Sequence, residues 1–256
     1  MSEYKFNPEE CYANIKIQFL DWLSNVNCKK VVLGISGGKD STVCAYLLSK
    51  IIGPENVYGV MLPNGLQKDI SDSMEVIKLT GINSSAFDIS NAVNALTDQM
   101  KFNGFTPSID TTINMPPRVR MTALYAIAQT VGGIVLNTDN LCEIHLGYYT
   151  CFGDGAGSYG LLRNLTVGEV IELGKWLGVP EHLIMKKPGD GLQPQGDEDR
   201  LGIKYADLDN YIRKNEGTDE FKQKILKRYA ANKFKTDIIN IPAPIFDYPD
   251  FVVTNK

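Results

Sequence analysis

The sequence predicts an α/β fold in which a parallel sheet is covered by helices on both faces. Three apolar runs have the length and near-continuous hydrophobicity of buried parallel strands: residues 31–35, 57–62 and 133–137. Longer segments with apolar residues at helical spacing lie between these runs. Alternation of this kind favours a parallel sheet, because parallel neighbours need a crossover connection that is usually a helix.

In the N-terminal half, helices and strands are expected to alternate at short intervals. Residues 8–26 have apolar side chains at helical spacing with polar ones between them, which predicts an amphipathic helix. A strand at 31–35 and a helix at 42–52 follow, and Gly53-Pro54 ends that helix. The next expected elements are a strand at 57–62, a helix at 70–79, a weaker strand at 84–89 and a helix at 91–102.

The C-terminal half is expected to contain one more strand, at 133–137, preceded by a helix at 117–130. Residues 147–160 are glycine-rich, which predicts a loop or lid, and residues 186–200 are polar and turn-rich, which predicts a mobile segment. Further helices are expected at 167–177, 205–214 and 218–231, followed by an extended, proline-containing tail.

Composition limits the classes of protein to consider. With 256 residues, 43% hydrophobic and 22% charged, the chain is expected to be one soluble domain spanning 1–256. A net charge of −4 argues against a general nucleic-acid binder. We find no signal peptide and no apolar run of membrane-spanning length, so no membrane association is expected. Five cysteines without a C-x-x-C pair favour reduced thiols in the cytoplasm.

The loop after the first strand has the composition of a phosphate-binding site. It reads Gly34-Ile35-Ser36-Gly37-Gly38-Lys39-Asp40-Ser41. Its glycines let the backbone approach an anion, and the following helix presents free N–H groups and the positive end of its dipole. The serine hydroxyls can donate hydrogen bonds, Lys39 adds positive charge, and Asp40 is a candidate Mg²⁺ ligand beside the phosphates.

The spacing of this loop excludes two other glycine loops. Leu33 occupies the position of the first glycine of a Walker loop, and Asp40 follows Lys39 where Ser or Thr is needed. The glycines do not fit G-x-G-x-x-G either. Residues 36–41 instead resemble the Ser-Gly-Gly-x-Asp-Ser loop of the ATP pyrophosphatases. This resemblance implies cleavage of ATP between the α and β phosphates and adenylation of an acceptor.

Further segments resemble one family of that group, the ammonia-dependent NAD⁺ synthetases. They occur in the family's order at residues 62–69, 114–121, 138–143, 147–155 and 197–202. The similarity covers about residues 20–245 and implies the Rossmann-like fold of the adenine nucleotide alpha hydrolases. A glutaminase domain is not expected, so the nitrogen donor would be ammonia, free or from a separate partner.

The resemblance implies that ATP and Mg²⁺ activate the carboxylate of deamido-NAD⁺ as an adenylate, from which ammonia displaces AMP. Residues 34–41 with Thr138 and Gly189 would then bind ATP, and Asp40 and Glu143 would bind the metal. Asp154 would orient or deprotonate the attacking ammonium, with Lys39 and Asp40 completing the expected catalytic set.

On the acceptor side the implied substrate-binding positions are Arg118, Cys151, Asp154, Ser158 and Lys235. Several residues there depart from the family pattern. Cys151 and Val167 replace lysines, Ser158 replaces an aspartate, Gly189 a threonine and Phe234 a histidine. These changes remove positive charge and hydrogen-bonding groups from the expected dinucleotide pocket, although the lysines at 186 and 187 are candidates to replace the charge.

Two alternatives to deamido-NAD⁺ amidation follow from these departures. One is another ATP-pyrophosphatase ligase with a different carboxylate acceptor, and the other is a nucleotide-binding homologue that has lost catalysis. The resemblance also implies a homodimer whose substrate site borders the subunit interface. The helix at 8–26 is compatible with this, although a monomer would bury it equally well. His145 invites a metal assignment, but with one other histidine and no cysteine cluster we do not expect it to bind one.

Overall fold

A five-stranded sheet forms the centre of the structure, a computed structural model that describes residues 4–67, 70–186, 197–238 and 241–254. Its strand order is β3-β2-β1-β4-β5, and all neighbouring strands are parallel. The bounds are β1 (Lys30–Gly34), β2 (Val57–Met61), β3 (Asn83–Ala86), β4 (Gly133–Asn137) and β5 (Tyr159–Gly160). The predicted fold class is therefore confirmed.

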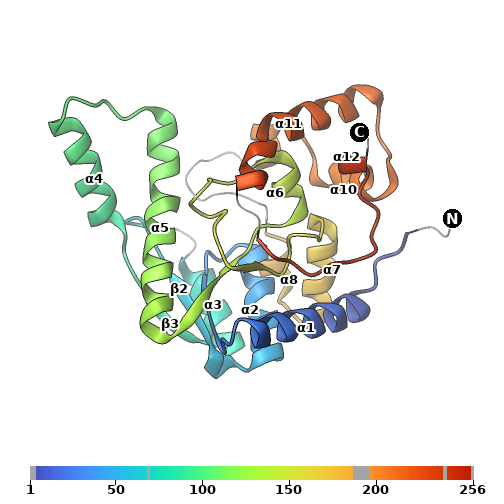
Figure 1. Ribbon diagram of the computed structural model, residues 1–256, viewed down its shortest axis with the longest axis horizontal. Coiled ribbons are helices and arrows are strands. Elements are labelled where there is room, and N and C mark those ends of the chain that lie inside the picture. Colours follow the sequence, from blue (N-terminus) through green and yellow to red (C-terminus); the bar gives the residue numbers. More distant parts are fainter. Residues whose placement is uncertain (1–3, 68–69, 187–196, 239–240, 255–256) are drawn as a thin grey trace.

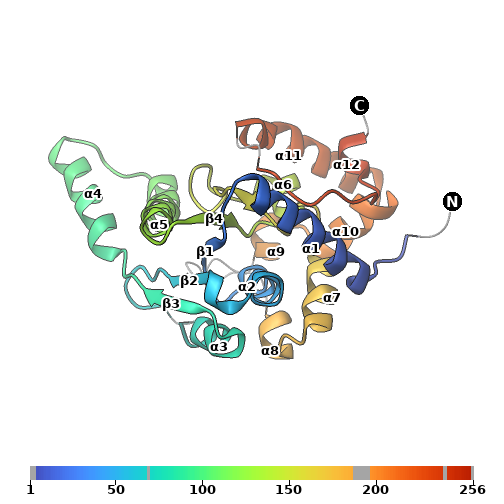
Figure 2. The ribbon, with the colours of Figure 1, turned by 60° about the horizontal axis from the view of Figure 1, so that its bottom comes forward.

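Helices cover both faces of this sheet (Figures 1 and 2). On one face lie α1 (Pro8–Asn25), α2 (Lys39–Ile52), α3 (Ile70–Thr80), α7 (Val167–Leu177) and α8 (Glu181–Ile184), with the short 3-10 helix η1 (Pro54–Asn56) before β2. On the other lie α4 (Ser90–Phe102) and α5 (Ile109–Val131). Strand β1 contributes side chains to the hydrophobic cores on both faces of the sheet. Val31 and Leu33 pack in the core on the α1 and α2 face, and Val32 packs in the core on the α5 face.

A third group of helices packs beside the sheet, at the upper right of Figure 1. It contains α6 (Leu141–Leu146), α10 (Tyr205–Lys214), α11 (Asp219–Ile238) and α12 (Phe251–Thr254) around an apolar cluster of their own, and α9 (Asp197–Leu201) precedes α10. Lys235 of α11 donates to the carbonyls of Gly147 (2.7 Å) and Tyr149 (3.0 Å). The α11 helix thus holds the glycine-rich loop that follows α6.

The strand order reverses between β1 and β4. The chain runs from β1 outward through β2 to β3, and then returns to the other side of β1 for β4 and β5. In open parallel sheets such a switch point leaves a crevice beyond the carboxyl ends of the two strands, where ligands bind. The Gly34–Ser41 loop follows β1 and residues 138–140 follow β4, so both open onto this crevice.

Two expected helix starts are wrong, and both err on the late side. Helix α2 begins at Lys39 rather than at 42, so Lys39, Asp40 and Ser41 form its first turn. Helix α5 begins at Ile109 rather than at 117, because Ser108 caps it by accepting from the N–H of Thr111 (3.1 Å). Pro116 and Pro117 lie inside this helix, although a proline in the sequence usually indicates a helix boundary.

Other differences concern short elements. The loop expected at 147–160 ends in β5, the tail expected to be extended contains α12, and α6, α8 and α9 were not expected. Helix α11 continues seven residues past 231, and β3 covers 83–86 rather than 84–89. Elements of two to six residues carry too few apolar positions for periodicity to reveal them. No described helix is long and apolar enough to cross a membrane.

Candidate active site

The loop after β1 is closed by its own hydroxyl groups. Ser36 and Ser41 place their Oγ atoms 3.1 Å apart, and Ser36 Oγ accepts from the N–H of Gly38 at 3.2 Å. Thr42 Oγ1 donates to the carbonyl of Gly38 at 2.8 Å. Gly37 has φ +76°, a conformation that favours glycine. These contacts hold the loop in one shape before any ligand binds.

The N-terminus of α2 is left open as an anion site. Its N-cap residue is Gly38, which offers no side chain to cap the first N–H groups. These groups have no partner within the helix, so they and the helix dipole point at the crevice. A phosphate bound there would satisfy them. The predicted phosphate loop therefore runs from the end of β1 to an open helix N-terminus, and its binding of phosphate stays a prediction.

Asp40 and Glu143 come together although they are far apart in the chain. Asn140 links them, because its Nδ2 donates to Asp40 Oδ1 (3.2 Å) and its N–H donates to Glu143 Oε2 (2.9 Å). Asn140 also caps α6 by accepting from the N–H of Glu143. Burial, and then the charges of Asp40 and Asp139, raise the pKa of Glu143 well above its usual value. Two carboxylates are thus held in mutual repulsion.

This pair suits a divalent cation. Within the described ranges, no three His, Cys, Asp or Glu side chains gather closely enough to hold a metal by themselves. Mg²⁺ does not need such a cage, since it usually binds one or two carboxylates together with substrate phosphates and water. Two apposed acids next to an open helix N-terminus match that donor set.

Lys39 is turned towards the acids. Its side chain is buried, and Nζ lies 2.8 Å from Asp40 Oδ2 and 5.9 Å from the ring centre of Tyr205. Although burial lowers its pKa, the charges of Asp40 and Glu143 raise it above the usual value overall, so the ammonium stays protonated. Lys39 is therefore a fixed positive charge at the base of the crevice.

The loop that carries Asp154 lies beside the residues that follow β4, because the Asp154 carbonyl accepts from Asn137 and its charge acts on Asp139. Asp154 Oδ1 accepts from the N–H groups of Thr150 (2.6 Å) and Gly155 (3.2 Å), which fixes the carboxylate. The side chain keeps surface open to solvent, yet the surrounding walls desolvate it enough to raise its pKa. An acid of this kind can exchange a proton with a ligand in the crevice.

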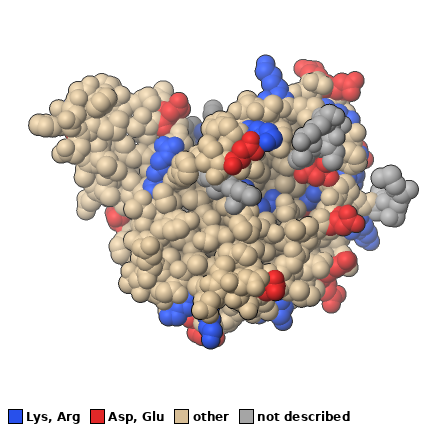
Figure 3. All heavy atoms as spheres, in the orientation of Figure 1, with Lys and Arg blue, Asp and Glu red and all other residues tan. Residues whose placement is uncertain are grey.

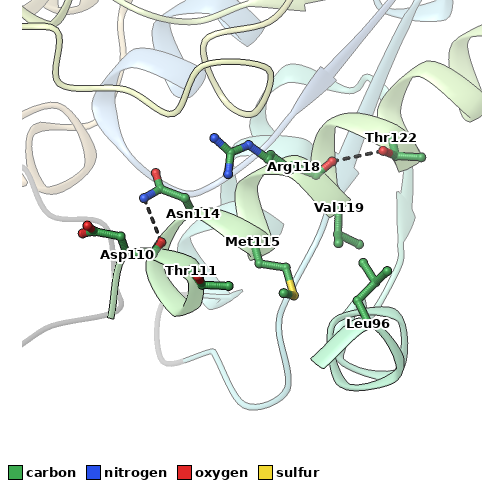
Figure 4. Close-up of a pocket in the computed structure, with 8 residues that line it drawn as sticks. All are labelled: Leu96, Asp110, Thr111, Asn114, Met115, Arg118, Val119 and Thr122. Atoms are coloured by element: carbon green, nitrogen blue, oxygen red, sulfur yellow. Dashed lines mark hydrogen bonds between the residues drawn. The ribbon is translucent and has the colours of Figure 1, made fainter. Parts of the chain in front are cut away.

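Arg118 and Cys151 meet on the acceptor side. The Nε of Arg118 donates to the carbonyl of Cys151 at 3.3 Å, so α5 and the Asp154 loop are joined there. Arg118 also borders a hollow of about 510 Å³ along α5, facing Leu96 of α4 (Figure 4). Lys235 lies beneath the same loop with its charge engaged by two carbonyls. These positions are brought together, and their contacts with a substrate stay predictions.

The remaining predicted residues have different settings. Thr138 follows β4 and is half-buried, with no hydrogen-bond partner for its hydroxyl among the described residues. Ser158 continues the sheet by donating its N–H to Val135, and its side chain contacts Tyr125. Gly189 lies outside the described residues. His145 pairs with Asp250 at 3.0 Å, which attaches the C-terminal segment to α6.

Sequence reasoning missed a buried polar group at the end of β4. Asn137 donates to Asp139 Oδ2 (3.0 Å) and to the carbonyl of Asp154 (3.2 Å), and Arg163 reaches Asn137 Oδ1 at 3.4 Å. Burial, and then the charge of Asp154, raise the pKa of Asp139 to about 7. The available signal was the polar run that directly follows an apolar strand, where site residues of parallel sheets gather.

Comparison with known proteins decides the family. A family model described as NAD synthase matches residues 12–240. The NH₃-dependent NAD⁺ synthetase of Pyrococcus horikoshii is 38% identical over 202 residues, 78% of this chain and 77% of its own length. The NH₃-dependent NAD⁺ synthetase of Mycoplasmopsis pulmonis is 34% identical over 252 residues, which are 93% of this chain and 96% of its own length. This chain belongs to the NAD synthase family.

A solved structure of similar sequence shares the fold of this chain. The solved NMN synthetase of Francisella tularensis superposes with a TM-score of 0.83 at 34% identity, over 90% of this chain and 96% of its own. The sheet, the loop after β1 and the helices on both faces are therefore those of the Rossmann-like pyrophosphate-loop fold. The relatives in question are ligases that use ATP, and the predicted resemblance is confirmed.

Proposed function

We propose that this protein is a ligase that amidates deamido-NAD⁺ with ammonia, giving NAD⁺, AMP and pyrophosphate. One observation carries the proposal. A single edge of the sheet brings together an open helix N-terminus, the Asp40–Glu143 pair and the Asp154 carboxylate. Membership of the NAD synthase family supports the same activity.

The arrangement suits a reaction in two steps. In the first, an oxygen of the nicotinate carboxylate attacks the α-phosphorus of ATP, and pyrophosphate leaves as the acyl-adenylate forms. The N-terminus of α2 and Lys39 would hold the phosphate oxygens. In the second, ammonia attacks the carbonyl carbon and AMP leaves. Asp154 would take the proton from the ammonium, which a carboxylate with a raised pKa does more readily.

We also propose Mg²⁺ as the metal, held by Asp40, Glu143 and the phosphates of ATP. The mutual repulsion of these two acids supports this, because a bound cation would remove it. Bound there, the ion would offset negative charge on the departing pyrophosphate. The Asn140 side chain would keep both acids in position.

A second acceptor is favoured by a specific observation. The NMN synthetase of Francisella tularensis is similar over nearly the whole chain, and amidation of nicotinate mononucleotide is the reaction that would yield NMN. The uncharged residues Cys151 and Val167 fall where a larger dinucleotide acceptor is expected to need lysines. Nicotinate mononucleotide is therefore the alternative acceptor, with the same adenylate chemistry.

We further propose a homodimer formed through α4 and α5. No residue of α4 is buried, and four large apolar side chains of α4, the start of α5 and the connection between them are more than half exposed: Leu96, Phe102, Phe105 and Ile109. The face of this projecting part that Figure 3 shows carries few charged side chains. Helix α1, by contrast, packs its apolar side against α7 of the same chain. A single domain and a cytoplasmic location stay predictions, the latter supported by five free cysteines.

The test measures pyrophosphate and AMP release with ATP, Mg²⁺ and ammonium, in the presence of deamido-NAD⁺, nicotinate mononucleotide or neither. Release that depends on deamido-NAD⁺ and is lost in Asp40→Asn supports the first acceptor. Preference for the mononucleotide by kcat/KM supports the second. ATP binding without turnover on either acceptor would contradict both and favour a nucleotide-binding homologue.

A further inference from the structure

Arg163 is a buried cation whose hydrogen-bonding capacity is largely unused. It lies between β5 and α7 and is 7% exposed. Only Nη1 has an acceptor in the described part of the chain, at 3.4 Å from Asn137 Oδ1. The nearest carboxylate oxygen, on Asp139, is 3.9 Å away. A buried charge normally makes close, well-satisfied contacts, because removing it from water is costly.

A second buried arginine, Arg213, does make the close hydrogen bonds that a buried charge normally makes. Arg213 is 5% exposed, and each of its three nitrogens donates a hydrogen bond of 2.6 to 2.8 Å. Its partners are Glu169 and the carbonyls of Pro249 and Asn164. Arg213 is thus fully used by the fold. Arg163 is buried to a similar degree, and its Nε and Nη2 have no acceptor among the residues that the structure describes.

Those two nitrogens face a space that solvent reaches. They are not among the fully enclosed polar atoms that have no partner. The stem of the side chain is fixed, because it crosses Gly160 so closely that a Cβ there would lie 2.4 Å from Arg163 Cγ and Cδ. The side chain is therefore held in place, and two donors of its guanidinium keep contact with solvent.

The neighbours of the guanidinium come from both halves of the crevice. On one side is Asp139, which follows β4 next to the ATP-side acids, and on the other is the loop carrying Tyr149 and Asp154. Pairing with Asp139 alone would not explain the arrangement, since it engages one nitrogen at a long distance. Two parallel N–H groups of one guanidinium match the two oxygens of a phosphate or carboxylate.

We propose that Arg163 is the anion-binding residue of the acceptor half, and that Nε and Nη2 receive the phosphate or the carboxylate of the nicotinate nucleotide. The proposal rests on the proposed function for the nature of the acceptor. Arg163 would supply the acceptor half with a positive charge that the uncharged residues Cys151 and Val167 do not provide. Both anionic groups belong to the same substrate, and the test separates them.

The experiment compares Arg163→Gln and Arg163→Lys with the wild type in pyrophosphate release. Three acceptors are used: deamido-NAD⁺, nicotinate mononucleotide and nicotinate riboside, which has no phosphate. The KM for the acceptor is expected to rise about 10- to 100-fold in Arg163→Gln, the usual range for loss of charge-assisted hydrogen bonds, and less in Arg163→Lys. The KM for ATP should stay within about twofold, which a general structural defect would not achieve.

The neighbouring Asn164→Ala is the matched control. Its Nδ2 donates to the carbonyl of Pro244 at 2.7 Å, away from the crevice, so acceptor KM should not change. A penalty that disappears with the riboside assigns Arg163 to the phosphate, and one that persists assigns it to the carboxylate. Unchanged KM for all three acceptors, or an equal rise in the KM for ATP, would overturn the proposal.

Direct titration calorimetry separates this inference from the proposed function. Absence of turnover by the wild type on any acceptor contradicts the function. In that case deamido-NAD⁺ and nicotinate mononucleotide are titrated into wild type and Arg163→Gln. Binding to the wild type that weakens at least tenfold in the variant supports the role of Arg163. Equal binding, or no binding to either protein, overturns it.

Discussion

At the scale of single residues, acidic side chains outnumber basic ones in the described part of the crevice. The charges of Asp40 and Asp154 both act on Asp139, and those of Asp40 and Asp139 act on Glu143. Lys39 and Arg163 are the buried cations nearest to them. A metal ion and the α2 N-terminus would add positive charge to the site. The phosphates of a bound ligand would balance that charge.

Replacing Glu143 by glutamine tests the proposed binding of a metal by Asp40 and Glu143. The amide keeps the size of the side chain and can still accept from Asn140, but it removes one metal ligand charge. We expect kcat to fall about 100-fold or more, because a metal ion supplies several kcal/mol of charge stabilisation. Without metal, the melting temperature should not fall, since repulsion from Asp40 is relieved. Wild-type activity in the variant would show that Glu143 binds no essential metal.

Asp139 should make stability depend on pH. Its pKa is raised to about 7 in the folded protein, against about 3.9 in an unfolded chain, so folding takes up a proton between these values. Stability is therefore expected to fall as the pH rises from 5 towards 7, with the full penalty above 7. Thermal melts of Asp139→Asn in metal-free buffer should show a shallower fall over this range. An identical pH slope in the variant would contradict this assignment.

At the scale of elements, one buried ion pair joins four separate parts of the chain. Arg213 of α10 binds Glu169 of α7 at 2.6 Å, and both rings of Tyr4 and Tyr248 lie over its guanidinium. Tyr4 OH also donates to Glu169 at 2.6 Å. Glu169 in turn completes the capping box of α7 with Thr166. The N-terminal and C-terminal segments are thus attached to the same point.

Removing the arginine should be strongly destabilising. Arg213→Met leaves Glu169 buried without its partner, which is expected to lower the free energy of unfolding by about 3–5 kcal/mol. Urea denaturation monitored by circular dichroism measures this change. Lys233→Ala, which breaks an exposed pair with Asp237 on α11, is the control and should have no measurable effect. Equal stability of the two variants would mean that the buried pair contributes nothing.

At the scale of the whole molecule, the outer apolar side chains of the projecting α4–α5 part remain exposed, although α5 packs its inner side on the sheet. The double variant Phe102→Ser and Ile109→Ser removes two of its most exposed apolar side chains, 85% and 79% accessible. We expect a dimer to become a monomer, measured by light scattering after size-exclusion chromatography. Ile17→Ser on α1, 67% exposed, is the matched control and should stay dimeric. A monomeric wild type would contradict the proposed interface.

The long elements were predictable because each carries its own pattern. Helices α7 and α10 have the expected bounds, as does β4, since apolar spacing and terminal glycines mark them in the sequence. The start of α5 was missed, because two prolines indicate a boundary and the serine cap eight residues before the first proline gives a weaker signal. Short α6 and β5 depend on contacts with neighbours more than on local preference.

The sequence by itself determined the parallel α/β fold, because local patterns mark its long elements, and its resemblance to a known family predicted the phosphate loop and the acids Asp40, Glu143 and Asp154. Only the tertiary structure decided which side chains meet. Asn140 bridges Asp40 across 100 residues of chain, and Arg163 is buried at a place where two of its donors stay open. Such contacts arise from the order of strands in the sheet, and no local pattern records which distant groups a buried charge will find.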